Sequence, residues 1–464
     1  MNNAGMTLTE SSKTAGPAYA AYRAAVDRLR TDLAAAPPDA AVRLGKRTSN
    51  LFRTRQRSGV TRLGVDAFSG VLAIDPQART ADVLGMTTYE DLVAATLPHG
   101  LMPLVVPQLK TITLGGAVTG LGIESTSFRH GLPHESVLEM DVLTGAGEVL
   151  CVRPQGEHRD LFYGFPNSYG TLGYALRLRI ELQPVRPYVA LTHHRFSSAA
   201  ECFAAMQRLV EDDIDFLDGV AFSPEELYLT TGRFADTAAR TSDYTGEHIY
   251  YRSIQQRETD YLTIHDYLWR WDTDWFWCSG AFGVQRPLVR RLWPKRWLRS
   301  DVYWRLVALE NRYGVKRRYD RLRGRPATEP VIQDVEIPVG RAGDFLAAFD
   351  RDVGMRPVWM CPLRQRDRSS TWDLYAMDPG ALYVNFGFWG TVPLAPRQPA
   401  DTHNRRVEAL VGELGGRKSL YSTAHYTPEE FWPLYGGSTY GDLKRRYDPH
   451  GRLLDLYAKC VERR

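Results

Sequence analysis

The chain has 464 residues, 44% hydrophobic and 24% charged, a soluble composition long enough for more than one core, so we expect two domains. No apolar run approaches the roughly 18 to 20 residues that cross a bilayer, and the N-terminus lacks a signal-peptide pattern, which together predict a cytoplasmic protein. The net charge is only +4, and the five scattered cysteines have no C-x-x-C spacing, which argues against a disulfide framework and a structural metal site.

The N-terminal third is expected to form an α+β unit. An Ala-rich amphipathic pattern predicts a helical extension over residues 1–41. Residues 42–187 alternate short runs rich in Val, Ile and Leu with turn residues, which is typical of strands. "TTYEDLVAATL" predicts a helix among them, because Thr88 can cap it and Glu90 and Asp91 lie in its first turn.

A second α+β unit is expected over residues 188–425. "FSSAAECFAAMQRLVEDD" and "RAGDFLAAFDRDV" have the period of amphipathic helices, and strands are predicted at "VIQDVEIPV", "PVWMCPL" and "ALYVNFGFWG". Residues 426–464 are expected to form a C-terminal segment that packs back near the first unit. The predicted fold class is therefore α+β with two domains.

Positive charge is concentrated between Arg286 and Arg325, where fourteen Lys or Arg stand against three Asp or Glu. Tryptophans and tyrosines are interleaved with these cations, a combination that suits an anionic lipid surface. No helix-turn-helix, zinc-finger or RNA-binding signature supports nucleic acid as a partner. We therefore expect residues 286–325 to face a membrane, and a solvated helical face is the alternative.

Residues 114–136, "LGGAVTGLGIESTSFRHGLPHES", are rich in glycine. Glycines let the main chain approach a ligand closely, and exposed backbone N–H groups suit a pyrophosphate. The spacing does not fit a Rossmann turn, because no strand–GxGxxG–helix unit can be drawn. A structural turn is the alternative, but "LGKRTSN", "PQLKTIT" and "NSYGTLG" add three polar or glycine-containing stretches, and together they favour a cofactor site.

This ordered set of loops resembles the FAD-binding domain of the vanillyl-alcohol oxidase superfamily. The chain is most similar to the branch that includes Δ24-sterol reductases, through "GIESTSFRHGL", "DLFYGFPNSYGTLGY", "VIQDVEIPV", "PVWMCPL" and "EEFWPLYGGSTYGDLKRRYDP". "KRTSNLFR", "TYEDLVAATLPHGL" and "PQLKTITLGGAVTGLGIES" resemble an actinobacterial group within that branch. That group reduces a methylene-branched acyl chain of phospholipid, the last step towards 10-methylstearic (tuberculostearic) acid.

The resemblance implies a two-domain fold, with a PCMH-type FAD-binding domain at 42–187 and an α+β substrate or cap domain at 188–425. It also implies NADPH as the electron donor and a phospholipid acyl chain as the substrate. A methyltransferase would supply the methylene intermediate. With the basic segment, it predicts a peripheral protein at the inner face of the cell membrane.

The resemblance further implies which residues bind FAD. Many oxidases of the superfamily attach FAD to a histidine in the first loop, but "LGKRTSN" has neither His nor Cys, so we expect FAD to be non-covalent. The implied residues are Lys46, Arg47, Thr48, Ser49 and Asn50 for the pyrophosphate, Thr113, Gly115, Gly116, Gly120, Gly122, Ile123 and Glu124 for the flavin, Ser127, Arg129 and His130 beside the ring or the diphosphate, and Gly173 towards the adenine, with Thr111 and Gly170 as further cofactor contacts.

The expected chemistry requires an acid. An isolated alkene has no carbonyl to accept a hydride, so a proton must reach the less substituted carbon while flavin N5 delivers hydride to the tertiary centre. The candidate acids are Glu124, Asp334, Glu336 and His425, of which Asp334 and Glu336 share one strand face by period-2 alternation. The expected substrate-lining residues are Trp359, Cys361, Tyr383, Asn385 and Tyr426. A sterol reductase, an FAD-dependent alcohol or sugar oxidase and a lipid-binding protein without turnover are the alternatives.

Overall fold

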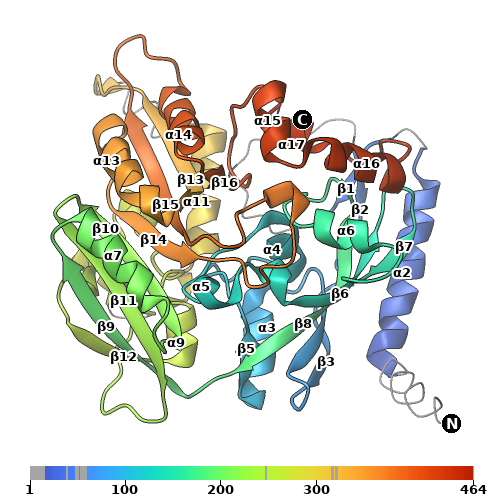
Figure 1. The fold of residues 1–464 in the computed structure, drawn as a ribbon, viewed down its shortest axis with the longest axis horizontal. Helices are drawn as coiled ribbons and strands as arrows, with labels where there is room; N and C mark the ends of the chain where they lie inside the picture. Colours follow the sequence, from blue (N-terminus) through green and yellow to red (C-terminus); the bar gives the residue numbers. More distant parts are fainter. Residues whose placement is uncertain are drawn as a thin grey trace.

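The computed structural model describes residues 16–37, 40–46, 52, 60–245, 248–314, 318 and 322–462. Two β-sheets form its frame, one in each half of the chain, and helices cover them (Figure 1). The chain passes from the first sheet to the second between β8 (Tyr174–Pro184) and β9 (Tyr188–Phe196). The expected two-domain α+β fold is confirmed. No helix in these described ranges is long and apolar enough to span a membrane.

The first domain is built on an antiparallel six-stranded sheet in the order β3-β4-β8-β6-β7, with β5 also paired to β8. Its other strands are β3 (Val71–Asp75), β4 (Thr80–Leu84), β5 (Leu101–Pro103), β6 (Val137–Leu143) and β7 (Val149–Val152), and its helices are α3 (Tyr89–Thr96), α4 (Leu114–Gly120), α5 (Ser127–His130) and α6 (Arg159–Gly164). A separate parallel pair joins β1 (Val42–Leu44) to β2 (Thr61–Leu63). The predicted cap of α3 is confirmed, since the Asp91 amide donates to Thr88 Oγ1 at 3.1 Å.

The second domain is built on an eight-stranded antiparallel sheet in the order β12-β9-β11-β10-β14-β15-β13-β16. The remaining strands are β10 (Phe216–Ser223), β11 (Glu226–Ala235), β12 (Thr259–Thr263), β13 (Thr328–Pro338), β14 (Val358–Leu363), β15 (Tyr383–Pro393) and β16 (Arg417–Lys418). Three amphipathic helices, α7 (Ala199–Leu209), α13 (Ala342–Asp352) and α14 (Thr402–Glu413), pack against this sheet in one hydrophobic core. Aromatic residues of the segment 267–277 belong to a second core, which continues into the first domain.

The remaining helices lie at the two ends of the chain and between β11 and β13. They are α2 (Pro17–Ala35), α8 (Tyr250–Ser253), α9 (Ile264–Leu268), α10 (Pro287–Leu292), α11 (Ser300–Tyr313), α15 (Pro428–Leu434), α16 (Gly437–Tyr447) and α17 (Leu456–Cys460), with 3-10 turns at Leu97–His99, Pro133–Ser136, Cys278–Phe282, Lys295–Trp297, Val339–Arg341 and Asp373–Tyr375. The C-terminal helices return to the first domain, where Lys444 Nζ donates to Thr171 O at 2.8 Å and Tyr447 OH donates to Asp160 at 2.7 Å (Figure 1).

The glycine-rich stretch is not a loop throughout. Its first seven residues form the short helix α4, capped by Thr113, whose Oγ1 accepts from the Gly116 amide at 3.2 Å. The Gly115 amide donates to Gly85 O at 2.9 Å, so these two N–H groups already have partners. A Cβ at Gly115 would lie 2.7 Å from Gly85 O, which shows that the glycine permits close packing of α4 on the end of β4.

Candidate active site

One large cavity, of about 3040 Å³, lies between the two domains. It is lined by the turns around α4, by the 167–173 turn, by β13 and β15 of the second sheet, and by residues 419–428 and α17 from the C-terminal part. Its volume exceeds the roughly 300 to 1,000 Å³ of an ordinary small-molecule site, so it has room for more than one ligand.

The turn after α4 faces this cavity with free backbone donors. Leu121, Gly122 and Ile123 line the cavity, and their N–H groups donate no hydrogen bond to any residue that the structure describes. Leu121 has a φ of +67°, a conformation that costs a non-glycine residue on the order of 1 kcal/mol or more and is found mostly at functional turns. The exposed N–H groups expected in this stretch are therefore present, but one turn later in the chain than Gly115 and Gly116.

A basic end of the cavity is formed by the β1–β2 pair. Arg43 of β1, Arg62 of β2 and Lys46 line it, and Lys46 Nζ lies 4.0 Å from the Cβ position of Gly116. The next four residues in the chain, predicted to hold the pyrophosphate, are Arg47, Thr48, Ser49 and Asn50, and they lie outside the described residues. The positive charge of this end suits a diphosphate.

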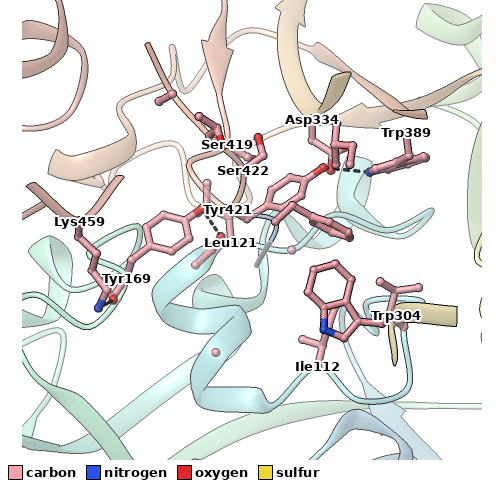
Figure 2. A pocket seen from close by; sticks show the side chains of 18 of the residues that line it. Ile112, Leu121, Tyr169, Trp304, Asp334, Trp389, Ser419, Tyr421, Ser422 and Lys459 are labelled. Atoms are coloured by element: carbon pink, nitrogen blue, oxygen red, sulfur yellow. Dashed lines mark hydrogen bonds between the residues drawn. The ribbon is translucent and has the colours of Figure 1, made fainter. Parts of the chain in front are cut away.

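The opposite side carries a half-buried acid on the second sheet. Asp334 of β13 lines the cavity, and Asn385 Nδ2 of β15 donates to its Oδ1 at 3.1 Å. Burial raises the pKa of Asp334 to about 6, while hydrogen bonds from Asn385 and Tyr421 act in the opposite direction. Trp389 Nε1 donates to the Tyr421 hydroxyl at 2.9 Å, so the three side chains Asp334, Tyr421 and Trp389 form one connected group (Figure 2).

Tyr421 is the member of this group that meets the aromatic wall. Burial and the charge of Asp334 hold the pKa of its hydroxyl well above the usual range, so it stays protonated at neutral pH. Its ring packs edge-on against Phe52, whose ring stacks on Trp275 at a centroid distance of 5.8 Å. Trp304 of α11 closes the same wall, with its centroid 5.1 Å from that of Phe52. Asp334 and Tyr421 thus border a largely aromatic, apolar space.

A further acid, Glu336, stands one layer behind the cavity. It is buried on the same face of β13 as Asp334 but does not line the cavity, because the hydroxyl of Tyr375 and that of Ser419 (3.4 Å) cover its carboxyl group. Burial raises the pKa of Glu336 to about 8. Ser419 itself lines the cavity and, among the described residues, is the one polar link between this carboxyl group and the cavity.

Glu124, a predicted cavity acid and flavin contact, also lies outside the lining. Its side chain enters a buried cluster in which Arg270 contacts Glu124 Oε1 at 3.4 Å and Asp218 Oδ2 at 2.9 Å. Burial raises the pKa of Glu124 to about 7, and Ser125 Oγ donates to it at 2.6 Å. Glu124 lies outside the lining because residue 124 follows the turn and its side chain points under it, where its contact with Arg270 connects the turn to the second domain.

The remaining predicted residues divide into two sets. Those that line the cavity are Lys46, Thr111, Thr113, Gly115, Gly116, Gly120, Gly122, Ile123, Gly170, Asp334, Trp359, His425 and Tyr426. Those that the structure places elsewhere are Glu124, Ser127, Arg129, His130, Gly173, Glu336, Cys361, Tyr383 and Asn385. Although Asn385 is not in the lining, it supports the cavity acid Asp334 from behind.

The residues placed elsewhere have local structural partners. Ser127 Oγ accepts from the Glu124 amide at 3.1 Å, and Cys361 Sγ contacts Glu124 O at 3.1 Å. Arg129 lies between Asp213 and Asp215, at 3.9 and 3.7 Å.

Three more have local contacts outside the lining. His130 pairs with Gln183 Oε1 at 3.0 Å, and burial lowers its pKa to about 4. The Tyr383 hydroxyl accepts from the Asp378 amide at 3.0 Å. Gly173 packs against β6, where its Cβ position lies 2.7 Å from Leu143 O. Each of these contacts lies at a turn or a strand end, away from the cavity.

Several cavity residues were missed by the sequence analysis. Tyr421 lies four residues before the candidate acid His425, but only the fold brings it to Asp334. Tyr169 donates to Gly120 O at 2.7 Å, and Lys459 Nζ donates to Tyr169 O at 2.6 Å (Figure 2). The glycine pattern of "NSYGTLG" marked this turn, whereas α17 gave no signal.

Comparisons with known proteins agree with this geometry. Residues 33–153 match the family model for the FAD binding domain. The chain is 25% identical over 417 residues to the Delta(24)-sterol reductase of Rattus norvegicus, covering 86% of this chain and 76% of that protein. The same coverage holds for the Delta(24)-sterol reductase of Arabidopsis thaliana, at 23% identity over 440 residues. Cytokinin dehydrogenase 2 of Oryza sativa subsp. japonica is 33% identical over 143 residues, 31% of this chain and 25% of that protein.

The protein is an FAD-binding oxidoreductase. Its first domain is of the PCMH type, and the second sheet forms the other wall of the cavity. The cavity residues fit FAD, because two buried polar atoms in the lining, Gln108 Nε2 and Ser422 Oγ, have no hydrogen-bond partner among the described residues. Together with the free N–H groups of residues 121–123 and the basic end at Lys46, they offer polar contacts along the length of a dinucleotide.

Proposed function

We propose that this oxidoreductase reduces an isolated carbon–carbon double bond of a lipid. Its substrate in this proposal is the 10-methylene acyl chain of a phospholipid, which becomes the 10-methyl chain of tuberculostearic type, with NADPH as the electron donor. The observation that carries the reaction class is the Asp334–Tyr421–Trp389 group, a protonated donor supported by a half-buried acid beside an apolar space. Relatives named Delta(24)-sterol reductase, matched over 86% of this chain, support it.

The alkene itself dictates what the protein must provide. An isolated double bond is reduced when one carbon receives a proton and the other receives a hydride. Protonation at the methylene carbon leaves the positive charge on a tertiary carbon, which then accepts the hydride. FAD, when bound and reduced, supplies the hydride. The chain's own residues must therefore hold a proton near the alkene and exclude water.

Tyr421 is the residue placed to deliver that proton. Its O–H bond breaks as the new C–H bond forms, and a protonated Asp334 transfers its own proton to the Tyr421 oxygen. Trp389 Nε1, which donates to the same oxygen at 2.9 Å, stabilises the negative charge that develops there. The bulk solvent then restores the proton of Asp334. Glu336, with a pKa raised to about 8, is the nearest alternative reservoir, through Ser419.

Phe52, Trp275, Trp304 and Trp389 give the proposed substrate channel an apolar wall. Such a wall holds an acyl chain without competing hydrogen bonds and keeps water from quenching the tertiary cation. His425 and Tyr426 line the far part of the cavity, where the His425 ring lies 3.5 Å from Asp401. Trp359 lines the cavity too, and its Nε1 donates to Asp218 at 3.2 Å, which fixes the indole.

FAD is held non-covalently in this proposal. Cys278 lines the cavity, but burial raises the pKa of its thiol to about 12, so it stays protonated and is a poor nucleophile. NADPH would reach the flavin through the same cavity, in alternation with the lipid. The substrate would come from a methyltransferase-type reaction that adds the methylene carbon.

A sterol reductase is the second candidate, because the similarity to Delta(24)-sterol reductases extends over 86% of the chain. The two substrates share one chemistry, since each gives a tertiary centre on protonation. Fatty acids from a deletion strain distinguish them by mass spectrometry. Accumulation of the methylene acid supports the acyl substrate, and an unchanged fatty-acid profile refutes it.

Anaerobic mixing tests the reaction class with the FAD-loaded protein. NADPH should bleach the flavin absorbance, and a methylene-acyl phospholipid in detergent should restore it. An alcohol that bleaches the flavin where NADPH fails would identify an oxidase and overturn the reductase proposal.

A further inference from the structure

Exposed apolar side chains gather on α10 and the 3-10 turn that follows it. Leu288 and Leu292 occupy one face of α10, four residues apart, and are 78% and 85% exposed. Trp297 follows on the turn and is 47% exposed. Exposure of apolar side chains of this size to water is unfavourable, so a cluster of them on a protein surface marks a contact surface. We call Leu288, Leu292 and Trp297 the apolar ridge.

Unpaired cations flank the apolar ridge. Arg286, Arg291, Lys295 and Arg296 are exposed and form no ion pair or hydrogen bond through their side chains with the residues that the structure describes. The Arg296 guanidinium lies 6.0 Å from the centroid of the Trp297 ring, so charge and aromatic surface are presented together.

Two other arginines of the segment are excluded from this surface. Arg290 is paired with the buried Asp274 at 2.7 Å, and Arg299 is paired with Glu90 at 2.7 Å. The segment is therefore divided by the fold into arginines that hold it onto the protein and cations that face outwards. A merely solvated face would not need this division, and it would not expose leucines between the cations.

Helix α11 connects this surface to the cavity. It begins at Ser300, three residues after Trp297, and Trp304 and Ala308 line the cavity. Leu309 lines the cavity and is 51% exposed, so it stands at the rim. At a rise of about 1.5 Å per residue, this rim lies about 14 Å along the helix from Ser300. A bilayer that touches the apolar ridge would thus lie near the cavity mouth.

We propose that the apolar ridge and its four unpaired cations dock the protein onto the surface of an anionic phospholipid bilayer. The cations pair with lipid headgroups, and the two leucines and Trp297 enter the interface between headgroups and acyl chains. Delivery of an acyl chain past Leu309 into the cavity rests on the proposed function, whereas the docking itself does not. Nucleic acid would attract the same cations, but it offers no apolar layer for the ridge.

Sedimentation of the FAD-loaded protein with vesicles tests the docking. Vesicles of phosphatidylglycerol and phosphatidylcholine should bind the protein, and pure phosphatidylcholine should bind it much less. Replacing Arg291, Lys295 and Arg296 by serine should weaken binding about 100-fold, from about 1 kcal/mol per cation. Replacing Leu288, Leu292 and Trp297 by serine should weaken it at least about tenfold.

A matched control removes three exposed cations elsewhere. Arg28 and Arg30 of α2 and Arg208 of α7, replaced by serine, change the net charge equally and should leave vesicle binding within about twofold. The proposal would be overturned if the control weakened vesicle binding as much as the Arg291, Lys295 and Arg296 variant does. It would also be overturned if vesicle binding were unchanged in that variant. Binding of a double-stranded DNA fragment by a protein that ignores anionic vesicles would overturn it too.

Turnover is scored separately. Wild-type protein that binds vesicles but reduces no methylene-acyl lipid contradicts the proposed function and leaves the docking supported. The cation variant and the apolar-ridge variant should keep their turnover on detergent-dispersed lipid and lose it on vesicles.

Discussion

Replacement of Tyr421 by phenylalanine tests the proposed proton delivery. The substitution keeps the ring against Phe52 and removes only the hydroxyl that lies between Trp389 and Asp334. A general acid contributes about 10²- to 10⁴-fold to a rate, so reoxidation of the flavin by the alkene should slow by that factor. Reduction of the flavin by NADPH requires no proton from Tyr421 and should keep its rate.

The variant should fold, and its loss of stability can be bounded. Removing the hydroxyl leaves Trp389 Nε1 without its acceptor, which costs about 1 to 3 kcal/mol. Tyr383→Phe is the matched control, because Tyr383 lies on β15 of the same sheet, its hydroxyl accepts from the Asp378 amide, and it does not line the cavity. It should lose comparable stability and keep its turnover. Stopped-flow absorbance measures both half-reactions, and urea unfolding measures stability.

The pH profile gives the same prediction a second readout. Asp334 has a raised pKa of about 6 and must be protonated to pass its proton to Tyr421, so turnover should be full below that pH and fall as the pH rises through it. Asp334→Asn should lose this inflection along with turnover. A Tyr421→Phe variant that reoxidises at more than about one tenth of the wild-type rate, with the inflection intact, would refute the reasoning and direct attention to Glu336.

Three other predictions concern the cofactor and its turn. Heat or acid should release all FAD into the supernatant, and yellow colour retained in the washed pellet would contradict non-covalent binding. Glu124→Gln should lower the free energy of unfolding by about 1 to 3 kcal/mol, since Arg270 keeps only one carboxylate partner. Its turnover should change less than tenfold. A hundredfold loss of turnover would identify Glu124 as the acid. Gly115→Ala places a methyl group 2.7 Å from Gly85 O, so FAD should be lost on gel filtration, whereas Gly412→Ala, with open space around it, should retain FAD.

The sequence determined the elements and the cofactor class. Periodicity and capping residues predicted a helix in "TTYEDLVAATL" and a strand at "VIQDVEIPV", and the structure has them at 89–96 and 328–338, because these elements depend on local pattern and backbone preference. Alternation on β13 placed Asp334 and Glu336 on one face. The resemblance to FAD-binding domains, carried by the glycine turns, agrees with the match over residues 33–153.

The tertiary structure decided which of the candidate residues meet. Glu124 is a sequence-predicted acid and Tyr421 is not, yet Glu124 lies in an ion cluster with Arg270, whereas Tyr421 reaches Asp334 from a segment almost ninety residues away in the chain. Such contacts depend on how the two sheets and the returning C-terminal segment pack, and the local sequence pattern does not specify that packing. The same holds for Arg290, which the sequence grouped with the membrane-facing cations and the fold pairs with buried Asp274. A buried charge without a partner is costly, so each buried charge pairs with a group that the fold brings near it. Residue type and spacing alone do not say which group that is.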